Sequence, residues 1–155
     1  MKKFILAMVL CVASMGAFAQ KTPHAVGVYL GGNIDLAYQY HFNNKNFVDA
    51  TLGCFSYNGV AASATYNWNI QEWSDWTPNF GTWKLWGGVG AGLGAFHEAF
   101  ILGPVGQLGF GFTLNAAPVT IGVNYRPMIT FGFGGDKHFH ANGFYNGGLT
   151  AVYRF

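Results

Sequence analysis

Five charged residues fall at positions where the alternation of the chain turns them toward the inside of the fold. Only 9% of the 155 residues are charged, and the five expected to face inward are Asp35, Asp49, Lys84, Arg126 and Arg154. A charge in a narrow interior is costly unless it is paired. We therefore expect these groups to pair or to meet water, joined by the amides of Gln39, Gln107 and Asn124. Such a network would fill the interior and leave no path for ions through the fold. The alternative is that each charge lies near an aqueous end, which suits Lys84 and Arg154.

Histidines near the C-terminus could meet acidic residues in space. His138 and His140 follow Asp136, and His97-Glu98 lies in a neighbouring predicted loop. Two imidazoles with carboxylates suit zinc or copper, whereas histidines in a solvated loop titrate independently. We expect the second arrangement, and hence no metal and no other cofactor, with His138 and His140 as the weak candidates for a metal site.

Nucleophilic side chains stand in no fixed catalytic motif. Ser56 lies near a predicted rim where His97 and Glu98 could reach it, as a Ser-His-acid hydrolase or acyltransferase requires. Ser63 is expected to face inward. Cys54 is expected to face outward in apolar surroundings, where a thiol is usually inert. We therefore predict that the chain is not an enzyme, and we keep a lipid-modifying enzyme as a lesser alternative.

Four glycines occupy alternate positions at Gly88, Gly90, Gly92 and Gly94. A phosphate-binding loop also uses glycine, but it needs a strand-to-helix turn and usually a Lys-Ser/Thr ending, and neither is present. The glycines are expected to leave room for bulky inward groups such as Trp86 or Tyr29, or to let a strand coil tightly.

Strands must position these side chains, because the chain alternates apolar and polar residues over most of its length. Clusters rich in Asn and Gly, which tolerate positive φ, mark the turns. The connection Gln71–Gly81, with Trp73, Trp76 and Pro78, is unusually long for a turn. The pattern predicts eight strands: Ala25–Leu30, Ile34–Phe42, Phe47–Ser56, Val60–Ile70, Thr82–Ala95, Ile101–Leu114, Val119–Thr130 and Tyr145–Phe155.

The larger apolar side chains gather on the face opposite the charges, which is the reverse of a lipocalin-like binder. Lipid would cover that face, and closure would remove the strand edges. We predict an all-β fold, an eight-stranded antiparallel up-and-down transmembrane β-barrel whose lumen is filled by side chains. Aromatic rings favour the headgroup region, so two girdles are expected. The outer girdle is expected at Phe96, Phe100, Phe131 and Tyr145. The girdle at the periplasmic side is expected at Tyr40, Trp68, Trp83, Phe112, Tyr125, Tyr153 and Phe155.

Residues 1–19 have the pattern of a cleaved secretory signal. Lys2 and Lys3 precede an apolar run from Phe4 to Val12, and Ala17-Phe18-Ala19 is a small-x-small cleavage site. A lipoprotein signal at Cys11 is the alternative, but Leu10 stands where a small residue is required. Removal of Lys2 and Lys3 leaves six basic and six acidic residues in 20–155. This balance gives no basic surface for nucleic acid.

Half of the residues are hydrophobic, at 51%, yet residues 20–155 have no continuous apolar run of the length that a membrane helix needs. The remaining single cysteine, Cys54, cannot form an internal disulfide. Composition therefore argues against a helical membrane protein and favours a single barrel domain over residues 20–155.

Several short motifs resemble those of small outer-membrane β-barrel proteins of Bacteroidetes, within the eight-strand group that includes the OmpA transmembrane domain and OmpX. The motifs are Ile34-Asp35-Leu36-Ala37-Tyr38-Gln39, the run 86–94 (WGGVGAGLG), Gly106-Gln107-Leu108-Gly109-Phe110, Asn124-Tyr125-Arg126-Pro127 and Val152-Tyr153-Arg154-Phe155. Asn124, Gly111 and Tyr29 depart from the acidic or basic residues that the family often has there. The resemblance implies the barrel more strongly than the usual network of lumen charges, and it implies no settled activity.

The resemblance also implies a Gram-negative outer-membrane location and assembly by the barrel assembly machinery through the C-terminal strand, with Tyr153 and Phe155 as its signal. We expect a monomer with a structural or surface-interaction role, with membrane lipid as one partner and an extracellular ligand or host protein as a candidate for another. The first alternative is a narrow passive pore.

Overall fold

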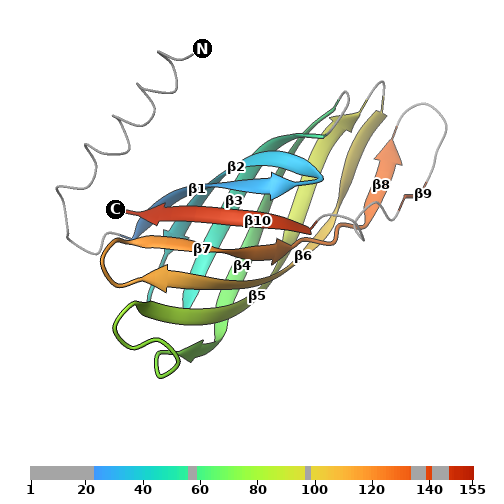
Figure 1. The fold of residues 1–155 in the computed structure, drawn as a ribbon. Coiled ribbons are helices and arrows are strands. Elements are labelled where there is room, and N and C mark those ends of the chain that lie inside the picture. Colours follow the sequence, from blue (N-terminus) through green and yellow to red (C-terminus); the bar gives the residue numbers. More distant parts are fainter. Residues whose placement is uncertain (1–22, 56–58, 97–98, 134–138, 141–146) are drawn as a thin grey trace, which may run out of the picture.

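The computed structural model describes residues 23–55, 59–96, 99–133, 139–140 and 147–155, and these residues form strands and turns (Figure 1). The predicted signal segment lies outside them. None of the described segments is a helix long and apolar enough to cross a membrane. The strands are β1 (His24–Gly31), β2 (Asn33–His41), β3 (Asn46–Phe55), β4 (Gly59–Trp73), β5 (Gly81–Phe96), β6 (Ala99–Leu114), β7 (Val119–Tyr125), β8 (Thr130–Phe133), β9 (Phe139–His140) and β10 (Gly147–Arg154).

The strands close into an antiparallel barrel. Pairing runs from β5 through β4, β3, β2, β1, β10 and β7 to β6, and β6 pairs with β5 to complete the ring. β8 continues the line of β7 along β6, so the described wall is an eight-stranded barrel. The predicted up-and-down barrel fold is confirmed.

The barrel is strongly staggered. A path through paired residues leaves β4 at Gln71 and returns to β4 at Val60, eleven residues nearer its start. One of those residues is taken up by a bulge at Ile70. A stagger of about ten residues over eight strands tilts them by roughly 40° from the barrel axis. β1 begins and β10 ends at one end of the barrel (Figure 1), which we call the terminal end; the other is the loop end.

The predicted strand Val119–Thr130 is interrupted. β7 ends at Tyr125, a bridge joins Met128 to Val105, and β8 resumes at Thr130 in the same register along β6. The interruption has a covalent cause, because Pro127 and Pro104 on the facing strand lack an N–H to donate. Gly106 N–H still donates to Pro127 O at 2.8 Å and Ile129 N–H to Pro104 O at 3.1 Å. The line formed by β7 and β8 therefore continues to Phe133. Around Pro127 it lacks half of its backbone hydrogen bonds to β6.

The expected long connection Gln71–Gly81 is also corrected. β4 runs on to Trp73, and the turn to β5 covers only residues 74–80. The bulge at Ile70 explains the difference. The strict alternation of inward and outward side chains ends there, whereas the pairing of β4 with β5 continues to Trp73.

The distribution of polar and apolar side chains is the reverse of that in a water-soluble protein, as predicted. Along β2, Ile34 and Leu36 are 68% and 65% exposed. On the inward face, Asp49 and Asn67 are fully buried, at 0% exposed. Polar groups therefore occupy the interior of the described barrel, and large apolar groups cover its outside.

Candidate functional site

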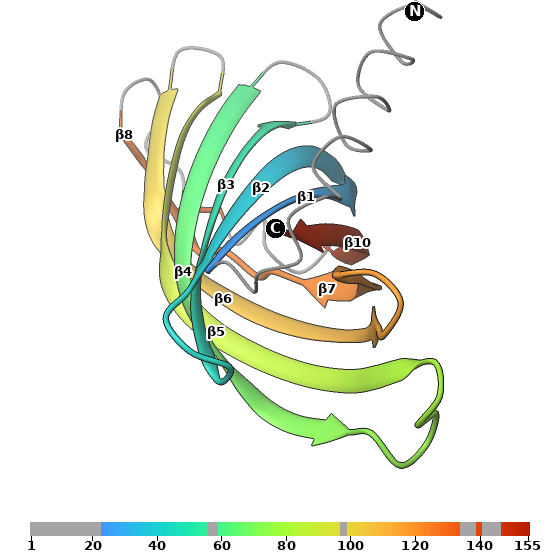
Figure 2. The ribbon, with the colours of Figure 1, turned by 90° about the vertical axis from the view of Figure 1, so that its left-hand side faces the viewer.

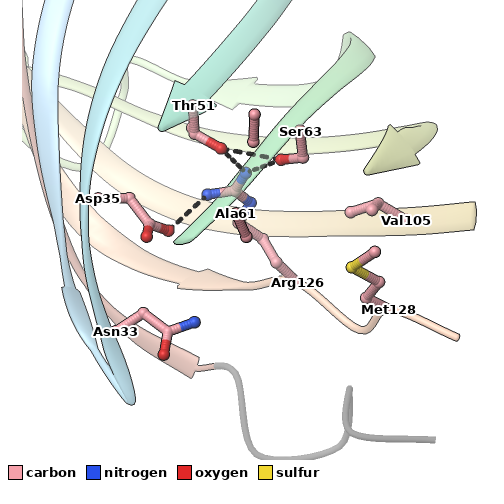
Figure 3. Close-up of a pocket in the computed structure, with 9 residues that line it drawn as sticks. Asn33, Asp35, Thr51, Ala61, Ser63, Val105, Arg126 and Met128 are labelled. Atoms are coloured by element: carbon pink, nitrogen blue, oxygen red, sulfur yellow. Dashed lines mark hydrogen bonds and ion pairs between the residues drawn. The ribbon is translucent and has the colours of Figure 1, made fainter. Parts of the chain in front are cut away.

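Arg126 is the centre of one polar cluster inside the barrel (Figure 3). It follows directly after β7, where Pro127 interrupts the strand. Its Nη1 donates to Asp35 Oδ2 at 3.3 Å in an ion pair that is largely buried. Its Nη2 donates to the hydroxyl oxygens of Thr51 and Ser63, both at 2.6 Å. Side chains from three strands, β2, β3 and β4, thus meet at one guanidinium.

The same guanidinium also lies against an aromatic ring. Arg126 Cζ is 4.9 Å from the ring centroid of Tyr29, a cation–π arrangement in a site shielded from water. The hydroxyls of Thr51 and Ser63 are 2.8 Å apart, so the acceptors are themselves linked. Arg126 is 5% exposed. A planar, always charged group with several fixed donors is suited to such a junction, and Lys would not replace it.

Asp49 is the centre of the second cluster. Tyr29 donates its hydroxyl to Asp49 Oδ2, and the amides of Gln107 and Gln39 donate to the same oxygen at 3.0 and 3.3 Å. Gln39 also donates to the Tyr29 hydroxyl at 3.2 Å. Tyr29 therefore joins the two clusters, with its ring on Arg126 and its hydroxyl on Asp49.

Further bonds extend this cluster across the lumen. Thr65 donates to Gln107 Oε1 at 2.5 Å, and Asn67 donates to Thr65 Oγ1 at 2.9 Å. His41 contacts Gln39 Oε1 through Nε2 at 3.2 Å. The chain of contacts thus runs from β4 and β6 to the terminal end of β2.

Glycines provide the space for these side chains. A Cβ added at Gly53 would lie 1.7 Å from Asp35 Oδ1, and one at Gly88 would lie 2.0 Å from Asn67 Oδ1. A Cβ at Gly109 would lie 2.1 Å from the ring of Trp86. Gly88 on β5 thus makes room for an inward side chain, as predicted for the glycine stripe, but this side chain is Asn67 and not Trp86 or Tyr29.

Apolar side chains close the lumen toward the terminal end. Ala25, Phe47, Trp86 and Val152 are at most 8% exposed, and Phe47 stacks on His41 with ring centroids 4.9 Å apart. At the rim, Lys84 pairs with Glu72 at 3.3 Å, with exposed fractions of 27% and 44%. Lys84 thus belongs to the rim and not to the inner clusters.

Two small pockets lie in the described lumen. One pocket of about 30 Å³ is lined by Asn33, Asp35, Thr51, Ser63, Arg126 and Met128, among others (Figure 3). A second of about 20 Å³ lies beside Asn124, Arg126 and Gly148. Each has room for only one or two water molecules. Neither gives a path for ions through the described barrel.

The structure places seven of the eight predicted network residues in three groups and leaves Asn124 outside them. Asp35 and Arg126 form one cluster, and Asp49, Gln39 and Gln107 form the other. Lys84 lies at the rim, and Arg154, the last residue of β10, lies at the same end. Asn124 is 5% exposed, and its amide has no hydrogen-bond partner among the described residues.

The sequence pattern did not reveal several partners in these clusters. Tyr29 was expected only as inward bulk, and no role was expected for the hydrogen-bonding side chains Thr51, Thr65, Asn67 and Glu72. Strand alternation was the available signal for four of these residues, because each stands at an inward position of its strand: Tyr29, Thr51, Thr65 and Asn67. Glu72 was hidden by the bulge, which shifts the alternation by one residue.

One girdle residue is misplaced in the prediction. Tyr153 pairs with Val119 at the terminal end, but Tyr125 pairs with Leu108 and Gly147 six residues further along β7. Because β8 continues the line of β7 to Phe133, Tyr125 lies near the middle of this line and not at the rim. The other six predicted girdle residues lie toward the terminal end: Tyr40, Trp68, Trp83, Phe112, Tyr153 and Phe155.

The residues considered for a metal or a hydrolase fall outside the described part of the chain. These are Ser56, His97, Glu98, Asp136 and His138, and the side chain of His140 is likewise not described. Within the described residues, no group of three or more metal-ligating side chains gathers.

Comparison with models of protein families, with curated proteins and with solved structures finds no match for this chain.

Proposed function

We propose that this chain is an integral barrel protein of the Gram-negative outer membrane that lies in lipid as a monomer. The observation that carries the proposal is the inversion of the wall, with Ile34 and Leu36 exposed while Asp49 and Asn67 are buried. An exposed apolar wall is unfavourable in water, whereas lipid covers it. The secretory pattern of residues 1–19 and the resemblance to small Bacteroidetes barrels support the same location.

The proposed role is structural or interactive and not enzymatic. Two hydrogen-bonded clusters and a layer of apolar side chains fill the lumen, which supports a sealed barrel over a passive pore. An outer loop would then contact a ligand, a host surface or a partner protein. Assembly would proceed through the C-terminal strand, where the rings of Tyr153 and Phe155 stack with centroids 6.5 Å apart on the outer wall.

Cell fractionation combined with gel mobility tests this proposal. The protein is expressed with its leader in a Gram-negative host, and outer-membrane fractions are run before and after boiling. We expect the protein in the outer membrane, with a mobility that changes on boiling because the barrel resists detergent until it is heated. A compact, ordered monomer that stays in solution without detergent would refute the proposal.

A further inference from the structure

An aromatic cluster extends the outer wall past the rim at the terminal end. Trp73 stacks on Trp76 with centroids 5.0 Å apart, and Trp83 stacks on Phe110 at 5.2 Å. Trp83 also lies 4.9 Å from Phe112. We call these five residues the tryptophan ridge. Figure 2 shows the β4–β5 hairpin, which carries the three tryptophans, standing out from the rim of the barrel.

The bulge at Ile70 puts the ridge on the outside. Beyond the bulge, Glu72 pairs with Lys84 and Trp73 pairs with Trp83 in the ladder. Glu72 therefore points to the lumen side, where its carboxylate meets the Lys84 ammonium. If Ile70 were paired in a regular ladder and no bulge were present, the alternation beyond it would be reversed, with the Glu72 carboxylate facing out and the Trp73 indole facing in. The local irregularity thus selects an apolar outer face.

The hairpin is held in place by hydrogen bonds within its turn and to the neighbouring turn. The N–H groups of Phe80 and Gly81 both donate to Thr77 O at 3.1 Å. Asn115, in the neighbouring turn, donates its backbone N–H to Phe80 O at 2.9 Å and its amide to Pro78 O at 3.2 Å. The turn is therefore tied to the next one along the rim, and the ridge is a preformed surface.

The surface of the hairpin is apolar and exposed. Trp76 is 60% and Phe80 is 72% exposed. The ridge continues directly into the outer wall, where Trp68, Ile70 and Leu108 are 40%, 50% and 49% exposed. The charged residues of 71–84 are Glu72, Lys84 and Asp75; the first two pair with each other, which leaves Asp75 in the turn.

We propose that the tryptophan ridge is a membrane anchor that inserts at the boundary between headgroups and acyl chains of the leaflet at the terminal end, with phospholipid as its partner. This inference rests on the proposed function, since it needs the outer wall to lie in lipid. Indole rings combine an apolar body with one N–H donor and favour that boundary. The ring faces of Trp73 and Trp83 stack on other rings, so they are not free to bind sugars. Continuity with the wall favours lipid over water around the hairpin.

Spin labels on single cysteines test the position of the ridge. In a Cys54→Ala background, the label is placed at Trp76→Cys, and the protein is reconstituted in vesicles of phosphatidylethanolamine and phosphatidylglycerol. Collision with oxygen reports lipid, and collision with a water-soluble nickel chelate reports water. Two matched controls are Val89→Cys on the outer wall, which is 61% exposed, and Lys45→Cys in a polar turn at the same end.

The label at position 76 is expected at headgroup depth, with nickel accessibility several-fold below that at position 45 and oxygen accessibility below that at position 89. Equal nickel accessibility at positions 76 and 45 would place the ridge in water and overturn the anchor. Dipolar broadening between labels at position 76 would show a second copy on the ridge and would also overturn it. If the label at position 89 is itself open to nickel, the proposed membrane function fails as well, so the two failures are distinguishable.

Discussion

At the scale of single residues, the lumen is defined by how its few charges are compensated. Arg126 has an ion pair, two hydroxyl acceptors and an aromatic ring around it, and Asp49 has three donors on one oxygen. Removing one member of such a cluster leaves the other buried without compensation. The energetic cost of a substitution here should therefore differ sharply from that of the exposed rim pair.

Replacing Arg126 by Met should destabilise the barrel by about 3–5 kcal/mol, the usual cost of breaking a buried pair from one side. Chemical unfolding in detergent or vesicles measures the change. The matched control is Lys84→Met at the rim, for which about 1 kcal/mol or less is expected because an exposed pair contributes little. Equal losses at both sites would contradict the central role given to Arg126.

A methyl group at Gly109 should be poorly tolerated. The new Cβ would lie 2.1 Å from the Trp86 ring, so the indole must move, and overpacking of this kind costs about 1–3 kcal/mol. Unfolding curves of Gly109→Ala compared with Gly147→Ala provide the measurement, since the nearest atom to a Cβ at Gly147 lies 3.9 Å away. A neutral Gly109→Ala variant would mean that the ring does not occupy this position.

At the scale of elements, alternation predicted the strands well and their interruptions poorly. β2 matches its expected faces because nothing in Ile34–His41 disturbs the period of two. The break at Pro127 and the extension of β4 past Ile70 depend on contacts with the facing strand, since a missing donor or a bulge changes pairing only in the presence of a partner. Glu72 was missed because of the bulge, and Tyr125 was misplaced because β8 continues the line of β7 along β6 to Phe133.

Deleting Ile70 should leave the fold intact. The pairs Asn69–Trp86 and Gln71–Leu85 already lie on either side of the bulge, so the deletion joins two ladders without turning any side chain over. Deleting Ala37 from the regular strand β2 should abolish folding, because half of the strand would exchange its inner and outer faces. Boiling-dependent gel mobility compares the two variants. Loss of folding in both would argue against a bulge at Ile70.

At the scale of the whole molecule, the barrel could be predicted because its signal is repeated in every strand. The pairing inside the lumen could not, because Tyr29, Asp49 and Gln107 come from three strands and meet only after closure and stagger bring them together. Which polar side chain reaches which partner depends on register, and register is a property of the closed ring.

The filled lumen should not conduct. Purified protein in planar bilayers is expected to show no large, steady conductance at neutral pH, because the described pockets hold one or two water molecules each. The triple variant Arg126→Ala, Asp49→Ala and Gln107→Ala removes most of the two clusters and should give openings if it still folds into the barrel. A large, steady conductance from the unmodified chain would instead favour the alternative hypothesis of a narrow passive pore.

The measurement that tests the inverted barrel most directly is a label scan along β2. Single spin labels at positions 34–40, in vesicles and in a Cys54→Ala background, should show high oxygen accessibility at Ile34, Leu36, Tyr38 and Tyr40, and low accessibility to oxygen and nickel chelate at Asp35, Ala37 and Gln39. Accessibility with the opposite phase, or nickel access along the whole strand, would contradict a polar interior enclosed by a lipid-facing wall.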